Sequence, residues 1–300
     1  MEKQGKVVVI GAGLMGHGIA HAFATTGYET VLVDVDAAAA ERGRTKIAEI
    51  LAGGVKLGKV AQADADSALA RLSVTTDLAA AATGAALVVE SAVEDIVVKL
   101  EILRTIDKLV APEAILATNT SALSVTEIAG ACADPSRVVG MHFFNPVHKM
   151  KLLEIVAGLE TSVETIARTR AIGEVLNKQV IVVNDSPGLT TSRVSAMMGN
   201  EAMWMVYEGV ATPEDVDTAH RLAFNHPMGP LELGDLTGWD TRLRVIRYLH
   251  STLGDKFRPC PLIIKMVASG RHGRKTGAGV YRYGEDGAKI PGSGIRASSF

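Results

Sequence analysis

Short apolar runs alternate with longer segments of mixed polarity over the first 185 residues of the chain. Runs rich in valine, isoleucine, leucine and alanine, with few polar interruptions, are typical of strands buried on both faces of a sheet. The segments between these runs have the length and periodicity of helices. We predict strands at residues 7–10, 31–33, 74–76, 86–90, 114–118, 137–142, 151–156 and 180–184. The predicted helices span residues 15–24, 37–51, 62–72, 93–110, 125–129 and 163–176.

This order of elements predicts an α/β fold with a Rossmann-like, doubly wound and mostly parallel sheet, because repeated strand–helix units place successive strands side by side. The helices at 37–51 and 62–72 have no strand between them. We expect Gly53 and Gly54 to break the first of these helices, since glycine is a poor helix former. The two segments then form a helical hairpin inserted near residues 37–72.

The pattern changes at residues 185–188, after which helical periodicity prevails. Helices are predicted at residues 189–209, 213–222, 231–253 and 261–269, and Thr212 and Pro213 suit the cap and first position of the second one. We therefore predict an N-terminal domain at 1–185 and an all-helical C-terminal domain at 186–300. Residues 284–300 are rich in glycine and serine, which is typical of a flexible tail.

Composition narrows the class of protein. The chain has 300 residues, is 47% hydrophobic and has a net charge of −2, which does not favour nucleic acid or a membrane surface as a partner. Cys132 and Cys260 form no CxxC pair, so no metal motif and no disulfide framework is indicated. The chain passes directly from Met1-Glu-Lys3 into a strand, and we expect a cytoplasmic enzyme without a signal peptide.

A glycine motif, Gly11-Ala-Gly-Leu-Met-Gly16, lies between the first predicted strand and helix. The first glycine permits the tight turn, the second lets a pyrophosphate approach the backbone, and the third lets helix and strand pack closely. The helix N-terminus offers free N–H groups to phosphates. Asp34, at the end of the second strand, can accept hydrogen bonds from both ribose hydroxyls and would repel a 2′-phosphate. The predicted NAD site comprises Gly11, Gly13, Leu14, Met15, Gly16 and Asp34.

Three further polar groups follow or interrupt later strands, where ligands bind in such folds. They are the run Thr118-Asn-Thr-Ser121, the run Met141-His-Phe-Phe-Asn-Pro146, and Glu154. Glu154 is flanked by apolar residues on both sides, so its carboxylate needs a cationic or N–H partner. His142 lies twelve residues upstream, on a neighbouring predicted strand.

With these motifs the chain resembles the L-3-hydroxyacyl-CoA dehydrogenases, and more closely the bacterial 3-hydroxybutyryl-CoA dehydrogenases. The motifs that carry the resemblance run in family order over residues 6–283. They are Gly11-Ala-Gly-Leu-Met-Gly-His-Gly-Ile-Ala20, Asn119-Thr-Ser-Ala-Leu123, His142-Phe-Phe-Asn-Pro146 with Met150 and Glu154, Asn200-Glu-Ala202, Pro227-Met-Gly-Pro-Leu231 and Gly273-Arg-Lys-Thr-Gly277.

The resemblance implies a reaction and roles for these residues. It implies NAD-dependent oxidation of a short-chain (S)-3-hydroxyacyl-CoA, with His142 as the general base, Glu154 fixing its tautomer and Ser121 bonding the reacting oxygen. It assigns to the NAD site Glu94, Lys99, Asn119, Ser121, Asn145 and Lys275. It assigns Lys56, together with Ser121, to CoA. No residue is assigned to a metal.

One position departs from the family pattern. The family often has an asparagine beside the substrate carbonyl, in an Asn-Arg pair after Pro-Gly-Phe and two further residues. Here the run is Pro187-Gly-Leu-Thr-Thr-Ser-Arg193, so Ser192 takes that catalytic position with a shorter side chain. We expect Ser192 to bond the substrate through water, or the acyl group to lie differently.

Two other functions remain open on the same motifs. The enzyme could oxidise a free 3-hydroxy acid of the sugar-acid type, or the chain could bind NAD(H) without turnover. The methionines at 197, 198, 203 and 205 give the first helix of the C-terminal domain an apolar character that suits a core or a dimer interface. We expect a homodimer, because exposed apolar faces usually mark an interface.

Overall fold

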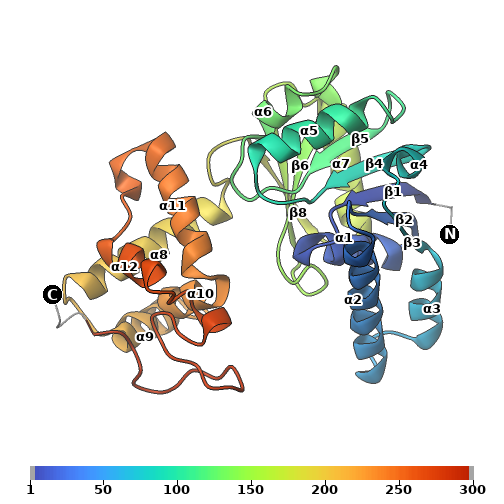
Figure 1. The fold of residues 1–300 in the computed structure, drawn as a ribbon. Helices are drawn as coiled ribbons and strands as arrows, with labels where there is room; N and C mark the ends of the chain where they lie inside the picture. Colours follow the sequence, from blue (N-terminus) through green and yellow to red (C-terminus); the bar gives the residue numbers. More distant parts are fainter. Residues whose placement is uncertain (1–3, 297–300) are drawn as a thin grey trace. The chain divides into compact units, whose positions relative to one another are not determined.

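The computed structural model describes residues 4–296 and divides the chain into two compact units, Met1–Ser186 and Pro187–Phe300. The first unit contains an eight-stranded sheet and the second unit is helical. Figure 1 shows the sheet and the helices of both units. Each unit has a hydrophobic core of its own. Among the helices of residues 4–296, none has the length and apolar character needed to cross a lipid bilayer.

The sheet of the N-terminal unit has the strand order β3-β2-β1-β4-β5-β6-β7-β8. Neighbouring strands are parallel except β6 and β7, which are antiparallel, so the mostly parallel sheet predicted from the sequence is confirmed. The strands are β1 (Gln4–Ile10), β2 (Tyr28–Val33), β3 (Leu72–Thr75), β4 (Ala85–Glu90), β5 (Ile115–Thr118), β6 (Val138–Phe143), β7 (Leu152–Ala157) and β8 (Gln179–Asn184).

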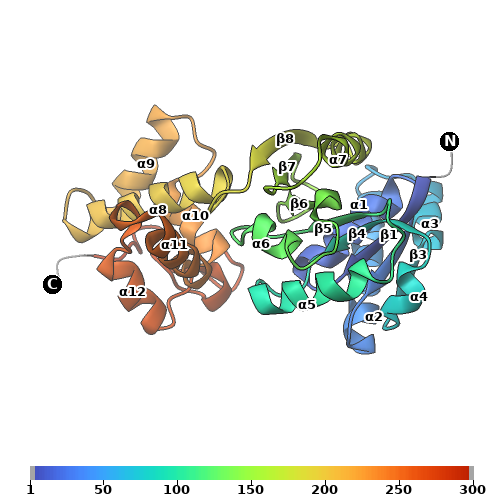
Figure 2. The same ribbon diagram turned by 90° about the horizontal axis from the view of Figure 1, so that it is seen from above.

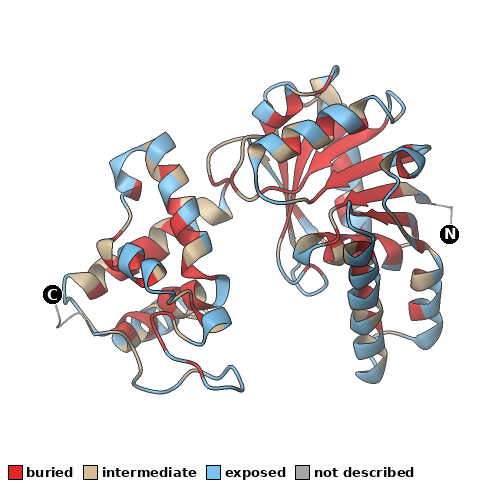
Figure 3. Ribbon diagram, viewed as in Figure 1, coloured by how far each residue is buried: buried red, intermediate tan, exposed pale blue. Residues whose placement is uncertain are grey.

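Helices cover both faces of this sheet (Figures 1 and 2). One face packs against α1, α2, α3 and α7, and the other against α4, α5 and α6, which leaves the central strands buried, as Figure 3 shows. The helices are α1 (Leu14–Thr25), α2 (Ala37–Lys56), α3 (Gln62–Ala70), α4 (Leu78–Ala82), α5 (Ile96–Asp107), α6 (Val125–Ala129) and α7 (Val163–Val175), with a 3-10 turn η1 (Pro135–Arg137). The short helix α4 has no counterpart among the predicted elements.

Helix α2 does not end where the sequence suggested. We expected Gly53 and Gly54 to break it, and this is wrong, because the helix continues to Lys56. A Cβ at Gly54 would lie 2.8 Å from Val60 Cγ2, so the glycine lets the following turn pack against the helix. This packing outweighs the ~1 kcal/mol that glycine costs in a helix interior. Gly58, with φ +66°, lies in the turn that follows.

The C-terminal unit consists of helices around a core that includes Trp239 and Tyr281. Its elements are α8 (Thr191–Tyr207), α9 (Pro213–Ala223), α10 (Pro230–Thr237), α11 (Trp239–Leu253) and α12 (Pro261–Ala268), with 3-10 turns η2 (Asp255–Phe257) and η3 (Arg274–Thr276). Thr212 caps α9 and Pro213 is its first residue, as predicted.

Two expectations for this unit are wrong. Residues 231–253 are not one helix, because Gly238, with φ +92°, separates α10 from α11. Residues 284–296 are not a loose tail, because they fold back onto the unit. Gly294 N donates to Glu214 Oε1 at 2.8 Å, and Ile295 N donates to Val280 O at 2.9 Å. The rest of the expected tail, residues 297–300, lies outside the described residues.

Candidate active site

The glycine motif forms the turn between β1 and α1, and its three glycines have different surroundings. Gly11 has φ +96°, and a Cβ there would lie 2.6 Å from Ser91 O. A Cβ at Gly16 would lie 1.6 Å from Gly11 O. A Cβ at Gly13 would meet no described atom within 4 Å. Gly11 and Gly16 therefore serve the turn and its packing, whereas Gly13 keeps a space open beside the backbone.

This space suits a pyrophosphate. Gly13 is the N-cap of α1 and no side chain of the described residues caps the helix, so its first N–H groups face outward for an anion. Leu14 is exposed and Met15 half-buried at this end. Asp34 Oδ2 accepts a hydrogen bond from Ala12 N at 2.8 Å, which holds the carboxylate beside the turn. The open space, the free N–H groups and the carboxylate fit a dinucleotide.

His142 and Glu154 are opposite each other on antiparallel strands. They are register partners of β6 and β7, and His142 Nδ1 lies 2.6 Å from Glu154 Oε2. The neighbours Met141 and Phe143 point into the core shared with α1, so His142 points to the other face. Glu154 is 0% exposed and His142 7%, which keeps the pair in a nearly dry place. The partner predicted for Glu154 is present.

The loop after β5 carries Ser121 and is held by Glu94. Glu94 Oε1 accepts hydrogen bonds from Thr120 Oγ1 at 2.6 Å, Ser121 N at 2.8 Å and Ser121 Oγ at 3.2 Å. One carboxylate oxygen therefore fixes both the backbone and the hydroxyl of Ser121. Two of the residues predicted for the cofactor site, Glu94 and Ser121, are thus in direct contact.

Asn119 joins three strand ends. Its backbone N donates to Glu90 O at 2.7 Å, and its side-chain Nδ2 donates to Ser91 Oγ at 3.3 Å. Its Oδ1 accepts a hydrogen bond from Phe143 N at 3.0 Å. Since Phe143 follows His142, Asn119 links the ends of β4 and β5 to the strand that carries the imidazole.

A buried ion pair joins Glu90 and Lys99. The sequence analysis did not identify Glu90 as a residue of the site. Lys99 Nζ lies 2.9 Å from Glu90 Oε2, and the two side chains are 0% and 1% exposed. The signal was an acid at the carboxyl end of an otherwise apolar strand, where it cannot stay buried without a cation. The family resemblance assigned Lys99 to the NAD site and gave it no acidic partner.

The remaining predicted residues belong to other segments of the chain, two of them to the C-terminal unit. Asn145 is exposed in the loop after β6, and Lys56 is exposed at the end of α2. Ser192 and Lys275 belong to the C-terminal unit: Ser192 is half-buried in the first turn of α8, and Lys275 Nζ lies 2.7 Å from Asp240 Oδ1. Among residues 4–296, no group of three or more histidine, cysteine or acidic side chains is arranged to hold a metal ion.

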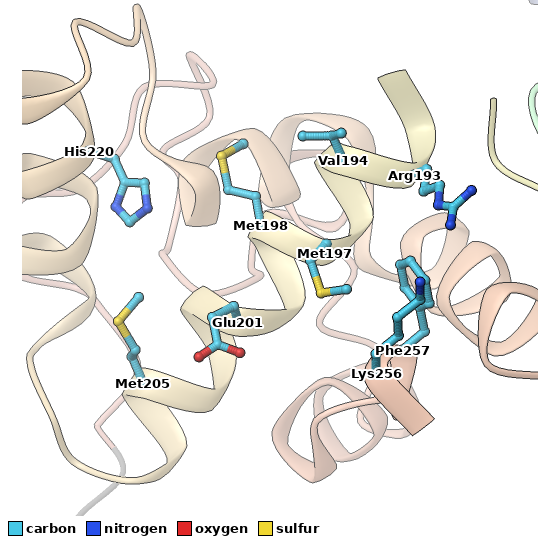
Figure 4. A pocket seen from close by; sticks show the side chains of 9 residues that line it. All are labelled: Arg193, Val194, Met197, Met198, Glu201, Met205, His220, Lys256 and Phe257. Carbon is cyan, nitrogen blue, oxygen red and sulfur yellow. The ribbon is translucent and has the colours of Figure 1, made fainter. Parts of the chain in front are cut away.

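The C-terminal unit has a hollow of about 450 Å³ along α8. Figure 4 shows the side chains that line it. They are Arg193, Val194, Met197, Met198, Glu201, Met205, His220, Lys256 and Phe257. Three of the four methionines noted in the sequence are among them, whereas Met203 is fully buried in the core.

Comparison with known proteins finds matches over most of the chain. The family model for the NAD binding domain of 3-hydroxyacyl-CoA dehydrogenase matches residues 6–186, and the model for its C-terminal domain matches residues 188–283. A probable 3-hydroxybutyryl-CoA dehydrogenase of Bacillus subtilis is 44% identical over 281 residues, which cover 93% of this chain and 98% of the relative. The mitochondrial hydroxyacyl-coenzyme A dehydrogenase of Sus scrofa is 37% identical over 284 residues, with 92% and 90% covered. The crystal structure of (S)-3-hydroxybutyryl-CoA dehydrogenase from Ralstonia eutropha is similar with a TM-score of 0.90 and 42% identity, covering 93% of this chain and 99% of that one.

Proposed function

The chain belongs to the 3-hydroxyacyl-CoA dehydrogenase family, and from this premise we propose that it oxidises short-chain (S)-3-hydroxyacyl-CoA thioesters and reduces acetoacetyl-CoA in the reverse direction. It is an NAD-dependent 3-hydroxyacyl-CoA dehydrogenase, so an enzyme rather than a non-catalytic NAD-binding protein. The preference for a four-carbon acyl group is supported by the names of its bacterial relatives.

The buried contact between His142 and Glu154 carries the proposal. A carboxylate only accepts hydrogen bonds, so the 2.6 Å contact supports a tautomer with the imidazole proton on Nδ1 and a lone pair on Nε2. Nε2 then takes the proton of the substrate 3-hydroxyl as general base. Glu154 stabilises the imidazolium that forms, because its negative charge is enclosed within hydrogen-bond distance of the ring. NAD, when bound, supplies the hydride acceptor at its nicotinamide C4.

Ser121 and the surrounding residues orient the reacting groups in this proposal. The Ser121 hydroxyl can turn from Glu94 towards the substrate oxygen, since Ser121 N remains bonded to Glu94 Oε1 at 2.8 Å and keeps the loop in place. Asn145 contacts the nicotinamide end of the cofactor, and Asp34 binds the adenosine ribose and disfavours NADP. We assign Ser192 to the acyl carbonyl, Lys275 to the cofactor and Lys56 to CoA on the family resemblance.

We also propose that the hollow along α8 is covered by a second copy of the chain. Its lining is apolar where the methionines lie and carries opposite charges at Arg193, Glu201 and Lys256 (Figure 4). A two-fold axis brings the same patch of two copies together, so the acid of one copy can pair with a base of the other. A Glu201→Lys variant should then shift the protein from dimer to monomer by light scattering. A monomeric wild type would refute this arrangement.

The decisive assay measures the reduction of acetoacetyl-CoA, free acetoacetate and longer 3-ketoacyl-CoAs. Each substrate is tested with NADH and with NADPH, and the loss of absorbance of the reduced cofactor gives the rate. We expect the highest kcat/KM with acetoacetyl-CoA and NADH. Turnover of free acetoacetate at a comparable kcat/KM would support the free 3-hydroxy acid dehydrogenase instead. A higher kcat/KM for long acyl chains would refute the short-chain preference.

A further inference from the structure

Lys99 is enclosed completely by the protein. Its ammonium has three N–H groups, and three acceptors surround it: Glu90 Oε1 at 3.0 Å, Glu90 Oε2 at 2.9 Å and the carbonyl oxygen of Asn119 at 3.2 Å. The side chain is 0% exposed. A lysine in this position has no donor left for a ligand, so any effect it has on the reaction must pass through the groups it holds.

Glu90 is saturated in the same way. Besides the two bonds from Lys99, its carboxylate accepts hydrogen bonds from Ala92 N at 2.6 Å and from Thr118 Oγ1 at 2.6 Å. These donors belong to the segment after β4 and to the last residue of β5. The carboxylate therefore ties together two strand ends and, through Lys99, helix α5. A buried charge satisfied by this many donors is rigid, because moving it would leave several groups unpaired.

Two routes lead from this pair to the proposed catalytic groups. The first runs through Asn119, whose carbonyl accepts from Lys99 and whose side chain accepts from Phe143 N at 3.0 Å. The ladder between β5 and β6 ends at Thr118↔Gly140, so this bond holds β6 beyond its last ladder pair, next to His142. The second runs through Glu94, whose Oε2 lies 3.6 Å from Lys99 Nζ while its Oε1 holds Ser121.

We propose that Glu90 and Lys99 are positioning residues for the reaction, which set the places of His142 and Ser121 through Asn119 and Glu94. The family resemblance assigned Lys99 to the NAD site, and its three bonded N–H groups make that role one of positioning rather than of direct contact with the cofactor. This inference rests on the catalytic roles assigned above to His142 and Ser121. It goes beyond these roles because the Glu90–Lys99 pair does not contact a reactant and is nevertheless expected to affect kcat.

The competing explanation is that the pair only stabilises the fold, and the two can be separated. Removing one member of a buried pair leaves an uncompensated charge and strongly destabilises a protein, whereas replacing both by neutral residues of similar size is often neutral for stability. The double variant Glu90→Gln with Lys99→Met should therefore regain stability. Methionine cannot donate to the Asn119 carbonyl, so the placement of the loop should not be regained.

The experiment compares Glu90→Gln, Lys99→Met and their double variant with the wild type. A matched control is the double variant Asp107→Asn with Arg137→Met, because these two side chains form a mostly buried 2.6 Å ion pair at the amino end of β6, away from the imidazole. Melting temperature, kcat with acetoacetyl-CoA and the Kd for NADH are measured for each. We expect both single variants to melt lower, and the site double variant to melt near the wild type with kcat reduced at least about tenfold. The NADH Kd should change less than kcat.

Three results would overturn the proposal. Recovery of kcat together with melting temperature in the site double variant would mean that the pair only stabilises the fold. A rise in NADH Kd as large as the fall in kcat would make Lys99 a direct cofactor ligand. An equal loss of kcat in the control would mean that disturbing any buried ion pair of this unit lowers kcat, so that the Glu90–Lys99 pair has no special role.

The proposal can also be judged without turnover. In protein labelled with [15N]histidine, the Nδ1 proton of His142 reports its bond to Glu154. We expect its resonance to move in the site double variant and not in the control. A wild type that does not reduce acetoacetyl-CoA would refute the proposed function alone, whereas an unmoved resonance would refute the positioning role.

Discussion

Gly13→Ala offers a direct test of where the cofactor phosphates bind. Gly13 has φ −68° and ψ −162°, which alanine adopts without strain, and an added methyl group would meet no described atom within 4 Å. The variant should therefore fold normally and gain about 0.4–1 kcal/mol in unfolding free energy, because alanine restricts the unfolded chain. The methyl group would instead occupy the space open to a pyrophosphate.

The expected loss of affinity follows from the hydrogen bonds at stake. A backbone N–H bonded to a charged phosphate oxygen contributes about 1.5–3 kcal/mol. Losing one such bond should weaken NADH binding by about 10- to 100-fold, since each 1.4 kcal/mol is a factor of ten. The measurement is a fluorescence titration with NADH, alongside thermal unfolding without cofactor.

Two other glycines serve as controls. Gly53 lies in α2 with no described atom within 4 Å of a Cβ, so Gly53→Ala should raise stability and leave the NADH Kd unchanged. Gly16→Ala would place a Cβ 1.6 Å from Gly11 O, and backbone atoms would have to move. That variant should lose stability by at least about 1–3 kcal/mol. An unchanged NADH Kd in a stable Gly13→Ala protein would refute the assignment of the pyrophosphate to this turn.

Further predictions concern the imidazoles and the serine of α8. His142→Gln should keep NADH affinity and lower kcat by about 10²–10⁴-fold, the usual contribution of one general base. A kcat measured by stopped flow that stays within about threefold of wild type (~0.6 kcal/mol) would contradict this prediction. Ser192→Ala should lower kcat far less than His142→Ala, and equal losses would reject that ranking. Burial lowers the pKa of His21 to about 4 from 6.5, with a smaller contribution from the nearby His148. Between these pH values the unfolded state therefore binds more protons than the folded state. The free energy of unfolding that depends on neutral His21 is fully present above pH 6.5 and is lost as the pH falls towards 4. The total loss is about 3 kcal/mol. His21→Gln should flatten this part of the curve of unfolding free energy against pH, and curves that stay parallel would show that His21 is not the group responsible.

The sequence was informative where residue type alone dictates geometry. The glycines, the apolar strands and the pairing of a lone acid with His142 followed from sterics, periodicity and the cost of burying a charge. What could not be predicted depends on contacts distant in the chain. Nothing local indicates that β7 runs antiparallel to β6, or that Lys99 turns inward to Glu90. The two wrong predictions of where helices end have the same cause. Gly54 stays in helix α2, where Val60 packs against it. Gly238 ends helix α10 with a positive φ, although the polarity pattern continues through it.

The placement of His142 and Glu154 on directly opposed residues of two paired strands has a consequence for how this enzyme can change. Backbone ladder bonds set the spacing of His142 and Glu154, so the connecting loop at residues 144–151 does not have to. Insertions or substitutions there, other than at Asn145, can alter what the loop touches while the contact between His142 and Glu154 stays intact. Sliding β7 by a single residue, by contrast, would send the carboxylate to the opposite side of the sheet.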